Sequence, residues 1–257
     1  MKRAAIFAHF DAQNEVKPYI IQHLRALATV CERIVFVSTS ALPVSAQQLV
    51  KAHAQQVVLM ENAGMDFGMW RQGMGCLDLE GIDELVLTNS SVLGPLTPLA
   101  ALFDQMAHRD CDGWGLTDNH EYNWHLQSYF LVFRKPALRS PAFASFWTSV
   151  LPYKDKGQVI RSYELGLTTF LCENGLRLQA MFSTEDLFPG AVPLARKELI
   201  RATGNTTSAC PLALLERGMP YVKVELLREN PCAVDLEPIY TGMHALGYDL
   251  ALVQFDR

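Results

Sequence analysis

Short apolar runs alternate with helix-like segments through the first 106 residues, and this alternation constrains the fold more than any other feature. Four runs predict buried strands: Ala4–His9, Ile34–Val37, Val57–Met60 and Leu85–Leu87. Apolar residues at helical spacing predict four helices after them: Val16–Val30, Ser45–Ala54, Phe67–Leu77 and Leu96–Met106. This order predicts an α/β fold with a mostly parallel, doubly wound central sheet flanked by helices.

The second half of the chain follows a different order. Strands are expected at Gly113–Thr117, Ser128–Phe133 and Leu176–Phe182. Helices are expected at Ala142–Val150, Gln158–Asn174 and Ser208–Arg217, whereas Asp186–Ala195 resembles a loop and the tail from Leu236 to Arg257 is weakly patterned. Because no linker or internal repeat interrupts the pattern, we predict a single domain over residues 1–257.

Charge and cysteine usage exclude several classes of protein. The net charge of -5 argues against a nucleic-acid-binding surface, which needs a basic excess. The six cysteines form no C-x-x-C pair, as expected for reduced thiols in the cytoplasm. The apolar stretch at the N-terminus is too short for a signal peptide, and no apolar run has the length of a membrane span. We therefore expect a soluble cytoplasmic protein, with no more than peripheral membrane contact.

Ligands of doubly wound sheets bind beyond the carboxyl ends of the strands. That rule selects His9–Asp11, Ser38–Ser40, Glu61–Asp66 and Thr88–Gly94. In the third segment, Gly64 allows close approach of the backbone to a ligand, and the side chains of Asn62 and Asp66 can accept hydrogen bonds from a base or ribose. The alternative is a turn in which Asp66 only caps the next helix.

The fourth segment holds Asn89, Ser90 and Ser91, where an acidic motif would bind a divalent metal against a diphosphate. Hard cations prefer anionic oxygen ligands, so a metal held mainly by this carboxylate-free segment would bind weakly. The alternative is a polar strand-to-helix loop, with Pro95 at the first helical position.

An aromatic and polar mixture in the second half is typical of sugar binding. Trp114 offers a ring face, and His125 and Gln127 offer hydrogen-bonding groups for sugar hydroxyls. In a metal cluster of His120, Glu121 and His125, the two histidines are five positions apart and lack the i, i+4 spacing of the histidines in zinc motifs. The alternative for His125 is a hydrogen-bonded structural histidine.

Glu164 is a carboxylate in an otherwise apolar helical stretch, where an acidic group is costly unless it is paired or used. It is our candidate for a general base, the alternatives being an ion pair with Arg161 or Lys156, or exposure to solvent. Lys223 and Arg228 are candidates for binding a diphosphate, the alternative being a solvated charged strand.

These segments occur in an order that resembles one family. The stretch His125–Lys135 reads HLQSYFLVFRK, and Leu226–Pro231 reads LLRENP. From about Ala5 to Asp235, the chain resembles the rhamnan synthesis protein F family of bacterial rhamnosyltransferases, which assemble cell-wall rhamnan and O-antigen. The family usually shows Asn-Asp-Ser-Val-Tyr-Gly-Pro where this chain has Ser90 in the acidic position and Leu93 in the aromatic one.

The resemblance implies a GT-A-like glycosyltransferase with a dTDP-rhamnose-type donor and a lipid-linked or polysaccharide acceptor. Residues 1–110 would bind the nucleotide sugar, and residues 111–257 would bind the acceptor and hold the catalytic base. The implied base of an inverting transfer is Glu164, with Asp118 as the second candidate. The implied donor site comprises His9, Asp11, Ser38, Asn62, Gly64, Asp66, Asn89, Ser90, Ser91, Lys223 and Arg228; the implied acceptor site comprises Trp114, His125 and Gln127.

Several alternatives stay open at this stage. A Mg²⁺ or Mn²⁺ ion bound through the donor diphosphate is one of them, because no protein metal ligands are assigned. The donor is otherwise a UDP-hexose or GDP-rhamnose, or the chain is a non-catalytic subunit that binds a glycan or a partner glycosyltransferase. Location at the cytoplasmic face of the inner membrane is the alternative to a freely cytoplasmic protein.

Overall fold

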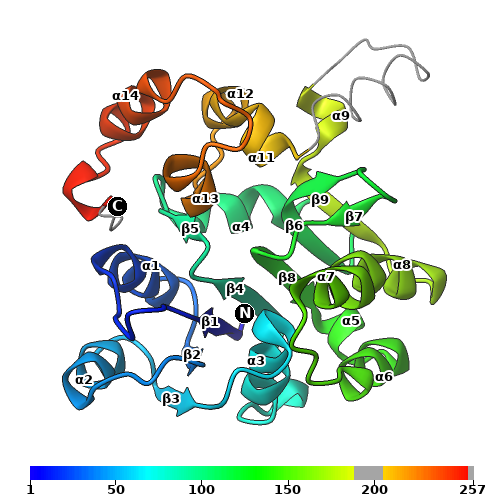
Figure 1. Cartoon of the computed structure of the whole chain (residues 1–257). Coiled ribbons are helices and arrows are strands. Elements are labelled where there is room, and N and C mark those ends of the chain that lie inside the picture. Colours follow the sequence, from blue (N-terminus) through cyan, green and yellow to red (C-terminus); the bar gives the residue numbers. More distant parts are fainter. Residues whose placement is uncertain (188–204, 254–257) are drawn as a thin grey trace.

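A mixed eight-stranded sheet runs through the centre of the computed structural model, which describes residues 1–187 and 205–253 (Figure 1). The first half of the chain contributes β1 (Arg3–His9), β2 (Arg33–Ser38), β3 (Gln56–Leu59) and β4 (Glu84–Asn89). The second half contributes β6 (Gly113–Asn119), β7 (His125–Leu126), β8 (Phe130–Arg134) and β9 (Leu178–Phe182). The strand order is β3-β2-β1-β4-β8-β6-β7, and β9 pairs with β6.

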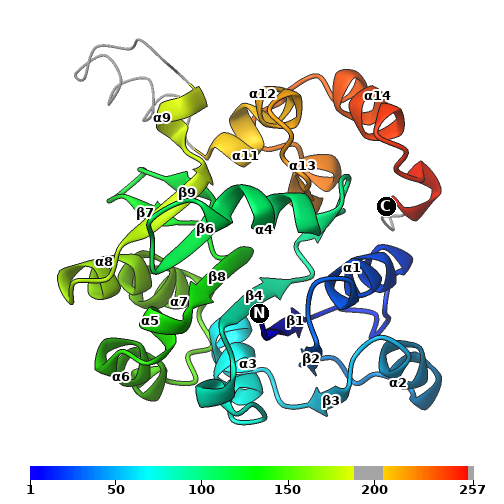
Figure 2. The same cartoon turned by 180° about the vertical axis from the view of Figure 1, so that it is seen from behind.

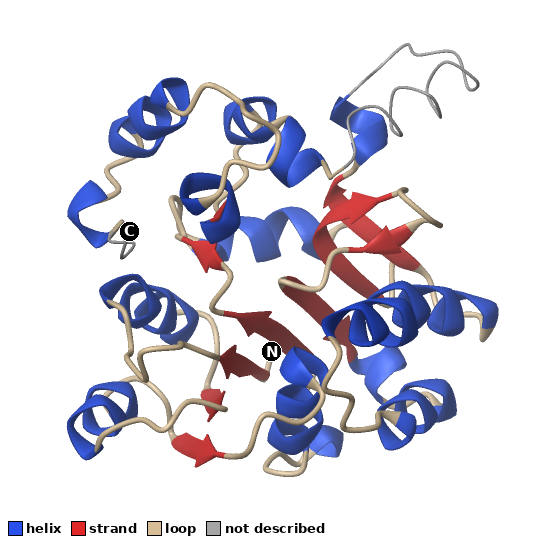
Figure 3. Cartoon of the chain, in the orientation of Figure 1, coloured by secondary structure: helices blue, strands red, loops and turns tan. Residues whose placement is uncertain are grey.

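The first four strands are mutually parallel, whereas β8 runs antiparallel to both β4 and β6. Beyond that reversal β9 pairs parallel with β6. The predicted α/β fold with a mostly parallel mixed sheet and flanking helices is therefore confirmed (Figure 3). Because β4 pairs with β8, one continuous sheet joins the two halves of the chain.

The helices flank this sheet on both faces. Those of the first half are α1 (Pro18–Ala28), α2 (Val44–Lys51), α3 (Met65–Met74), η1 (Leu79–Gly81) and α4 (Leu99–Ala107). Those that follow up to residue 187 are α5 (Lys135–Leu138), α6 (Pro141–Ser149), α7 (Lys156–Val159), η2 (Ile160–Glu164), α8 (Leu165–Glu173) and α9 (Thr184–Leu187). The last are α11 (Thr206–Ala209), α12 (Pro211–Glu216), α13 (Val224–Arg228), α14 (Glu237–Ala245) and η3 (Leu250–Leu252).

Alternation along the buried strands distributes side chains between two cores. Ala5 and Phe7 of β1 pack with α1, α2 and α4, whereas Ala4 and Ile6 pack with α3, α6 and α8. The view from behind brings α4 to the near side of the sheet (Figure 2). Strands covered on both faces are apolar throughout, which is why the first four were visible in the sequence.

The second half departs from the predicted helices at two places. The single helix expected over Gln158–Asn174 begins at Lys156 and is interrupted by η2, a five-residue π-turn that a 3.6-residue pattern does not reveal. The helix expected over Ser208–Arg217 is divided at Cys210, which has φ -132° and ψ 42°. Pro211 follows it, and a residue before proline disfavours the helical conformation.

The C-terminal part of the chain adds detail that the sequence did not give. The alternative of a charged strand over Tyr221–Pro231 applies only to β10 (Val222–Lys223), which is followed at once by α13. Asp186 and Leu187 belong to α9 and not to a loop, and residues 188–195 of that predicted loop lie outside the described residues. The tail forms α14 and η3 up to residue 253, and Ile239 and Met243 of α14 are buried in the core. Within the two described ranges, every helix is too short or too polar to cross a bilayer.

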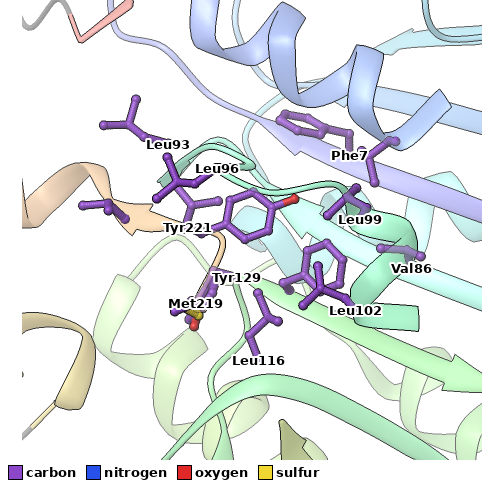
Figure 4. Packing of buried hydrophobic residues seen from close by; sticks show 14 of the residues in the cluster. Phe7, Val86, Leu93, Leu96, Leu99, Leu102, Leu116, Tyr129, Met219 and Tyr221 are labelled. Carbon is purple, nitrogen blue, oxygen red and sulfur yellow. The ribbon is translucent and has the colours of Figure 1, made fainter. Parts of the chain in front are cut away.

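The C-terminal segment is joined to the main sheet through β5 (Val92–Leu93), which pairs antiparallel with β10. Gly94 has φ 137°, and a Cβ atom there would lie 2.5 Å from the carbonyl oxygen of Pro220. Tyr221 packs among buried side chains from distant elements, including Phe7, Leu93 and Leu96 (Figure 4). Its hydroxyl lies 2.8 Å from Nε2 of His23 on α1. Gly94 therefore allows the approach that places Lys223 beside β4.

We expect Gly94→Ala to lower the free energy of unfolding by about 1–3 kcal/mol or more, since the residue combines a left-handed φ with a backbone collision. Gly242→Ala is the matched control, because a Cβ atom there meets nothing closer than Leu215 Cδ1 at 3.7 Å. In the middle of α14, Gly242→Ala should raise the free energy of unfolding by about 0.5–1 kcal/mol. Urea unfolding followed by circular dichroism measures both; equal stabilities of the two variants would contradict the account.

Candidate functional site

A cavity of about 680 Å³ lies at the carboxyl ends of β1, β2 and β4. Its walls come from the loop after β1, from Thr39 after β2, from the start of α3 and from the segment after β4. Residues before β8, α7 with η2, and β10 with α13 complete them. The cavity therefore occupies the place where ligands of parallel sheets bind.

The structure brings many of the predicted site residues together in this cavity. Those that line it are Asp11, Asn62, Asp66, Asn89, Ser90, Ser91, Glu164, Lys223 and Arg228. They come from both halves of the sequence, and the most distant along the chain from β1 are Lys223 of β10 and Arg228 of α13.

Other predicted donor residues are structural. His9 and Ser38 do not line the cavity; Nδ1 of His9 lies 2.9 Å from Oγ of Ser38, in the interior between β1 and β2. Burial lowers the pKa of His9 to about 4, so this imidazole is neutral at pH 7. The structure therefore does not bring these two side chains to the cavity with the other predicted donor residues.

Gly64 is absent from the cavity wall and instead shapes the turn before α3. It has φ 81°, Met65 after it has φ 50°, and the Gly64 amide donates to the carbonyl oxygen of Tyr153 at 3.0 Å. Four residues on, a Cβ atom on Gly68 would lie 1.9 Å from the carbonyl oxygen of Ala63. These glycines position Asp66, and the expectation that Gly64 itself approaches the donor is not met.

The predicted acceptor residues lie in the interior. Trp114 has no exposed surface and packs against Phe103 and Phe130, with ring centroids 5.5 and 6.0 Å away. His125 is buried with Nδ1 2.9 Å from the Asn123 carbonyl oxygen. Gln127 is buried too, and its Oε1 accepts a hydrogen bond from Thr117 at 2.6 Å. None of the three lines the cavity, so the structure does not bring the predicted acceptor residues to it.

Asp118, the second candidate for the base, is also a structural carboxylate outside the cavity. Its Oδ1 accepts from the amide and the hydroxyl of Thr184, both at 2.7 Å, and its Oδ2 accepts from Trp124 Nε1 at 2.9 Å. Burial alone would raise its pKa, but these bonds and the nearby His120 outweigh burial and hold the pKa below its usual range. A carboxylate so bound is a poor proton acceptor, which favours Glu164 over Asp118 as the candidate base.

Asp66 anchors a hydrogen-bond network at the centre of the cavity. Asn89 donates from Nδ2 to Oδ2 of Asp66 at 2.9 Å. The Oδ1 atom of Asn89 accepts from the Ser91 amide at 3.1 Å and from the Ser91 hydroxyl at 2.6 Å. The Asn89 amide is thereby oriented, so its NH₂ group points to the carboxylate.

Three ionisable groups from distant segments meet beside this network. Burial raises the pKa of Asp66 to about 6; the Asn89 hydrogen bond opposes the shift and the charge of Glu164 adds to it. Burial lowers the pKa of Lys223, whereas the charges of Glu164, Glu225 and Asp66 raise it. Nζ of Lys223 lies 4.7 Å from the ring centroid of Tyr129. Such groups in one cavity are typical of a functional site.

Glu164 ends η2, where the π-turn changes the direction of the side chains relative to a regular helix. Its Oε1 accepts a hydrogen bond from the amide of Ser128 at 3.2 Å. Ion pairing with Arg161 or Lys156, an alternative left open by the sequence, is not present within the described residues, where Arg161 lies 3.9 Å from Asp155. Glu164 therefore lines the cavity with one oxygen held by backbone.

Many residues of the cavity wall were not among the predicted site residues, and Phe10, Ser128, Tyr129 and Lys156 are four of them. Phe10 has an exposed fraction of 54%, unusual for a phenylalanine, and it directly follows β1. Ser128 and Tyr129 lie inside the stretch HLQSYFLVFRK, immediately after the His125 and Gln127 that we chose. The position of Phe10 at a strand end was a usable signal; nothing in the sequence distinguished Lys156 from other lysines.

A comparison with known families decides the classification. The family model described as rhamnan synthesis protein F matches residues 34–253. The chain belongs to this family. Virulence protein VirA of Vibrio anguillarum is 29% identical over 192 residues, 66% of this chain and 62% of that protein. Uncharacterized protein y4gN of Sinorhizobium fredii is 28% identical over 160 residues, 60% of this chain and 42% of that protein. The chain thus spans less than two thirds of the length of these curated relatives.

Solved structures with a similar chain path have little sequence in common with this family member. TarS 1-349 of S. aureus has a TM-score of 0.45 at 12% identity, covering 98% of this chain and 89% of that one. The 4-diphosphocytidyl-2C-methyl-D-erythritol synthase of Anaerococcus prevotii has a TM-score of 0.43 at 9% identity, covering 78% and 95%.

The residues of this family member do not fit a resident metal. In the described part of the chain, no three His, Cys, Asp or Glu side chains lie together as a ligand set. At the end of β4 the network offers the amide of Asn89 and two hydroxyls. A hard cation prefers several carboxylate oxygens, so we derive no step through a protein-bound metal.

The raised pKa of Asp66 predicts a pH-dependent stability. The folded chain keeps this proton to higher pH than the unfolded chain, so the free energy of unfolding falls as pH rises from about 4 to about 6. Asp66→Asn removes this dependence, and we expect the variant to gain about 1–3 kcal/mol relative to wild type between pH 4 and pH 7. Denaturant unfolding of wild type and Asp66→Asn at several pH values measures the difference between their free energies of unfolding. If that difference did not change between pH 4 and pH 7, the raised pKa of Asp66 would be contradicted.

Proposed function

We propose that the chain is a glycosyltransferase that moves a sugar from a nucleoside diphosphate donor to an acceptor hydroxyl. The observation that supports this most is one cavity, at the carboxyl ends of parallel strands, which holds the ammonium of Lys223 beside the carboxylates of Asp66 and Glu164. A cation suits a leaving diphosphate, and a carboxylate suits a hydroxyl that must lose a proton. Membership of the rhamnan synthesis protein F family agrees with this chemistry.

In the proposed complex, the nucleoside lies over the ends of β1 and β2. The exposed ring of Phe10 offers an apolar face to the base, and Asp11 and Asn62 offer oxygen acceptors to base or ribose. Phe10 is joined to the end of β4, since its amide and carbonyl groups each lie 3.4 Å from the Ser90 hydroxyl. The diphosphate then extends along Asn89–Ser91 toward Lys223.

The proposed reaction is a single displacement with inversion. The acceptor oxygen forms a bond to the anomeric carbon as the bond from that carbon to the diphosphate oxygen breaks. The hydroxyl proton passes to Glu164, whose second carboxylate oxygen is free of the Ser128 contact. The nucleoside diphosphate leaves with the electron pair, and its charge is stabilised by Lys223.

Family membership suggests the sugar and the setting. We propose rhamnose as the transferred sugar, from a dTDP-rhamnose-type donor, and a lipid-linked or polysaccharide acceptor in rhamnan or O-antigen assembly. We further propose that the enzyme acts in the cytoplasm, at the inner face of the inner membrane, with partner glycosyltransferases adding the neighbouring sugars. Because Trp114, His125 and Gln127 do not line the cavity, we propose that the wall formed by α7 and η2 contacts the acceptor.

Glu164→Gln tests the base. Glutamine keeps the Oε1 acceptor for Ser128, so we expect an unchanged dissociation constant for dTDP and a transfer rate at least 100-fold lower. Glu173→Gln, an exposed change of the same charge on α8, is the matched control and should retain wild-type turnover. Turnover is measured as release of nucleoside diphosphate from dTDP-rhamnose, UDP-glucose and GDP-rhamnose, each with a lipid-linked acceptor.

The outcomes separate the alternatives. Turnover with UDP-glucose or GDP-rhamnose alone would replace the proposed donor. Nucleotide binding without turnover of any donor by wild type would indicate a non-catalytic subunit. Full activity in Glu164→Gln would remove Glu164 as the base.

Phe10→Ala tests the nucleoside position. Loss of stacking between an aromatic ring and a base costs about 1–3 kcal/mol, so the dissociation constant for dTDP should rise about 5- to 100-fold. Tyr122→Ala removes an aromatic ring with an exposed fraction of 74% outside the cavity and should bind dTDP as wild type does. Isothermal calorimetry measures both, and equal affinities would place the base elsewhere.

A further inference from the structure

Four cationic side chains line the cavity, and two of them already have anionic partners. Nζ of Lys17 lies 2.7 Å from Glu15, and Arg228 lies 2.5 Å from Glu229. In contrast, Lys156 and Lys223 form no ion pair or hydrogen bond with any other described residue. The cavity therefore contains two positive charges without a bonded counter-ion.

These two lysines belong to one electrostatic site, although they come from α7 and β10. The positive charge of Lys156 lowers the pKa of Lys223, so the two ammonium groups repel each other. Both also stabilise the charge of Asp66. Repulsion between like charges near a partly buried surface is relieved when an anion binds between them.

Local structure holds Lys156 in place without neutralising it. Asp155 caps α7 by accepting a hydrogen bond from the amide of Gln158 at 2.7 Å, and its carboxylate lies 3.9 Å from Arg161. The preceding loop is bonded to the turn that positions Asp66, through the amide of Gly64 and the carbonyl oxygen of Tyr153 at 3.0 Å. The backbone that carries Lys156 is thus hydrogen-bonded to the turn that positions Asp66.

We propose that Lys156 and Lys223, the lysine pair, together bind the diphosphate of the donor and supply the double positive charge that a divalent cation would otherwise provide. The inference rests on the proposed function, and it adds a residue and a mode of recognition to it. Two ammonium groups act as point charges, and they need no carboxylate ligands at the end of β4, where Ser90 stands. Arg228 is secondary, because Glu229 already pairs with it.

Calorimetry with inorganic pyrophosphate, dTDP and dTMP, in EDTA and then in Mn²⁺, tests the lysine pair. The variants are Lys156→Met, Lys223→Met and Lys156→Arg, with Lys154→Met as the matched control, an exposed lysine of the same loop that does not line the cavity. We expect wild type to bind dTDP in EDTA. Affinity for dTDP and pyrophosphate should fall at least tenfold in Lys223→Met and at least threefold in Lys156→Met, with a smaller loss for dTMP.

Lys156→Arg should retain most of the wild-type affinity, and Lys154→Met should differ from wild type by less than twofold. Circular dichroism and thermal unfolding confirm that each variant is folded. Wild-type pyrophosphate affinity in Lys156→Met, or dTDP binding by wild type only with Mn²⁺, would overturn the lysine pair and leave the proposed function in place. Failure of wild type to bind any nucleoside diphosphate while it binds pyrophosphate would overturn the proposed function instead.

Discussion

The pairing of β10 with β5 is the interaction on which the cavity depends. Val222 and Lys223 pair with Leu93 and Val92, and the amide of Val224 donates to the Ser91 carbonyl oxygen at 2.9 Å. These few bonds bring the segment around residue 223 to the end of β4, more than 130 positions earlier in the chain. Without them the parallel strands would still form a sheet, but its carboxyl edge would have no cation from the C-terminal segment. Close backbone approach at Gly94 is what such a short pairing needs.

The charges of the cavity favour a ligand over an empty state. The charge of Glu164 makes ionisation of Asp66 more costly, the charge of Lys156 repels that of Lys223, and burial weakens the solvation of Asp66 and Lys223. Oppositely charged groups offset part of this cost without forming direct ion pairs. The anionic end of a ligand would lie against the lysines, and hydroxyls at its other end would donate hydrogen bonds to the carboxylates. The site therefore suits a sugar joined to a diphosphate.

Much of the fold could be predicted from the sequence, because β1 to β4 are buried on both faces and therefore apolar. The antiparallel β8 and the two-residue β10 could not, since their positions depend on pairing with distant strands. For the site, Asp66 was chosen from its place after a strand end, Glu164 as a carboxylate in an apolar helical stretch and Lys223 as a cation suited to a diphosphate. The structure instead buries Trp114, His125 and Gln127. The sequence could not reveal this, because a buried aromatic or hydrogen-bonded polar side chain has the same composition as a sugar site. Only the packing around such a side chain distinguishes a buried structural residue from one that binds a sugar.

The side chain at position 90 determines whether the end of β4 offers a metal ligand or a hydroxyl that contacts the loop after β1. A carboxylate there would add a further negative charge to a cavity that Asp66 and Glu164 already line, and a bound cation would offset it. The hydroxyl of Ser90 instead lies 3.4 Å from both backbone groups of Phe10, and its carbonyl oxygen accepts a hydrogen bond from Tyr19 at 3.0 Å. The end of β4 thereby holds the loop after β1 rather than a metal ligand. Positive charge must then come from elsewhere in the cavity, and β10 and α7 are the elements that provide it.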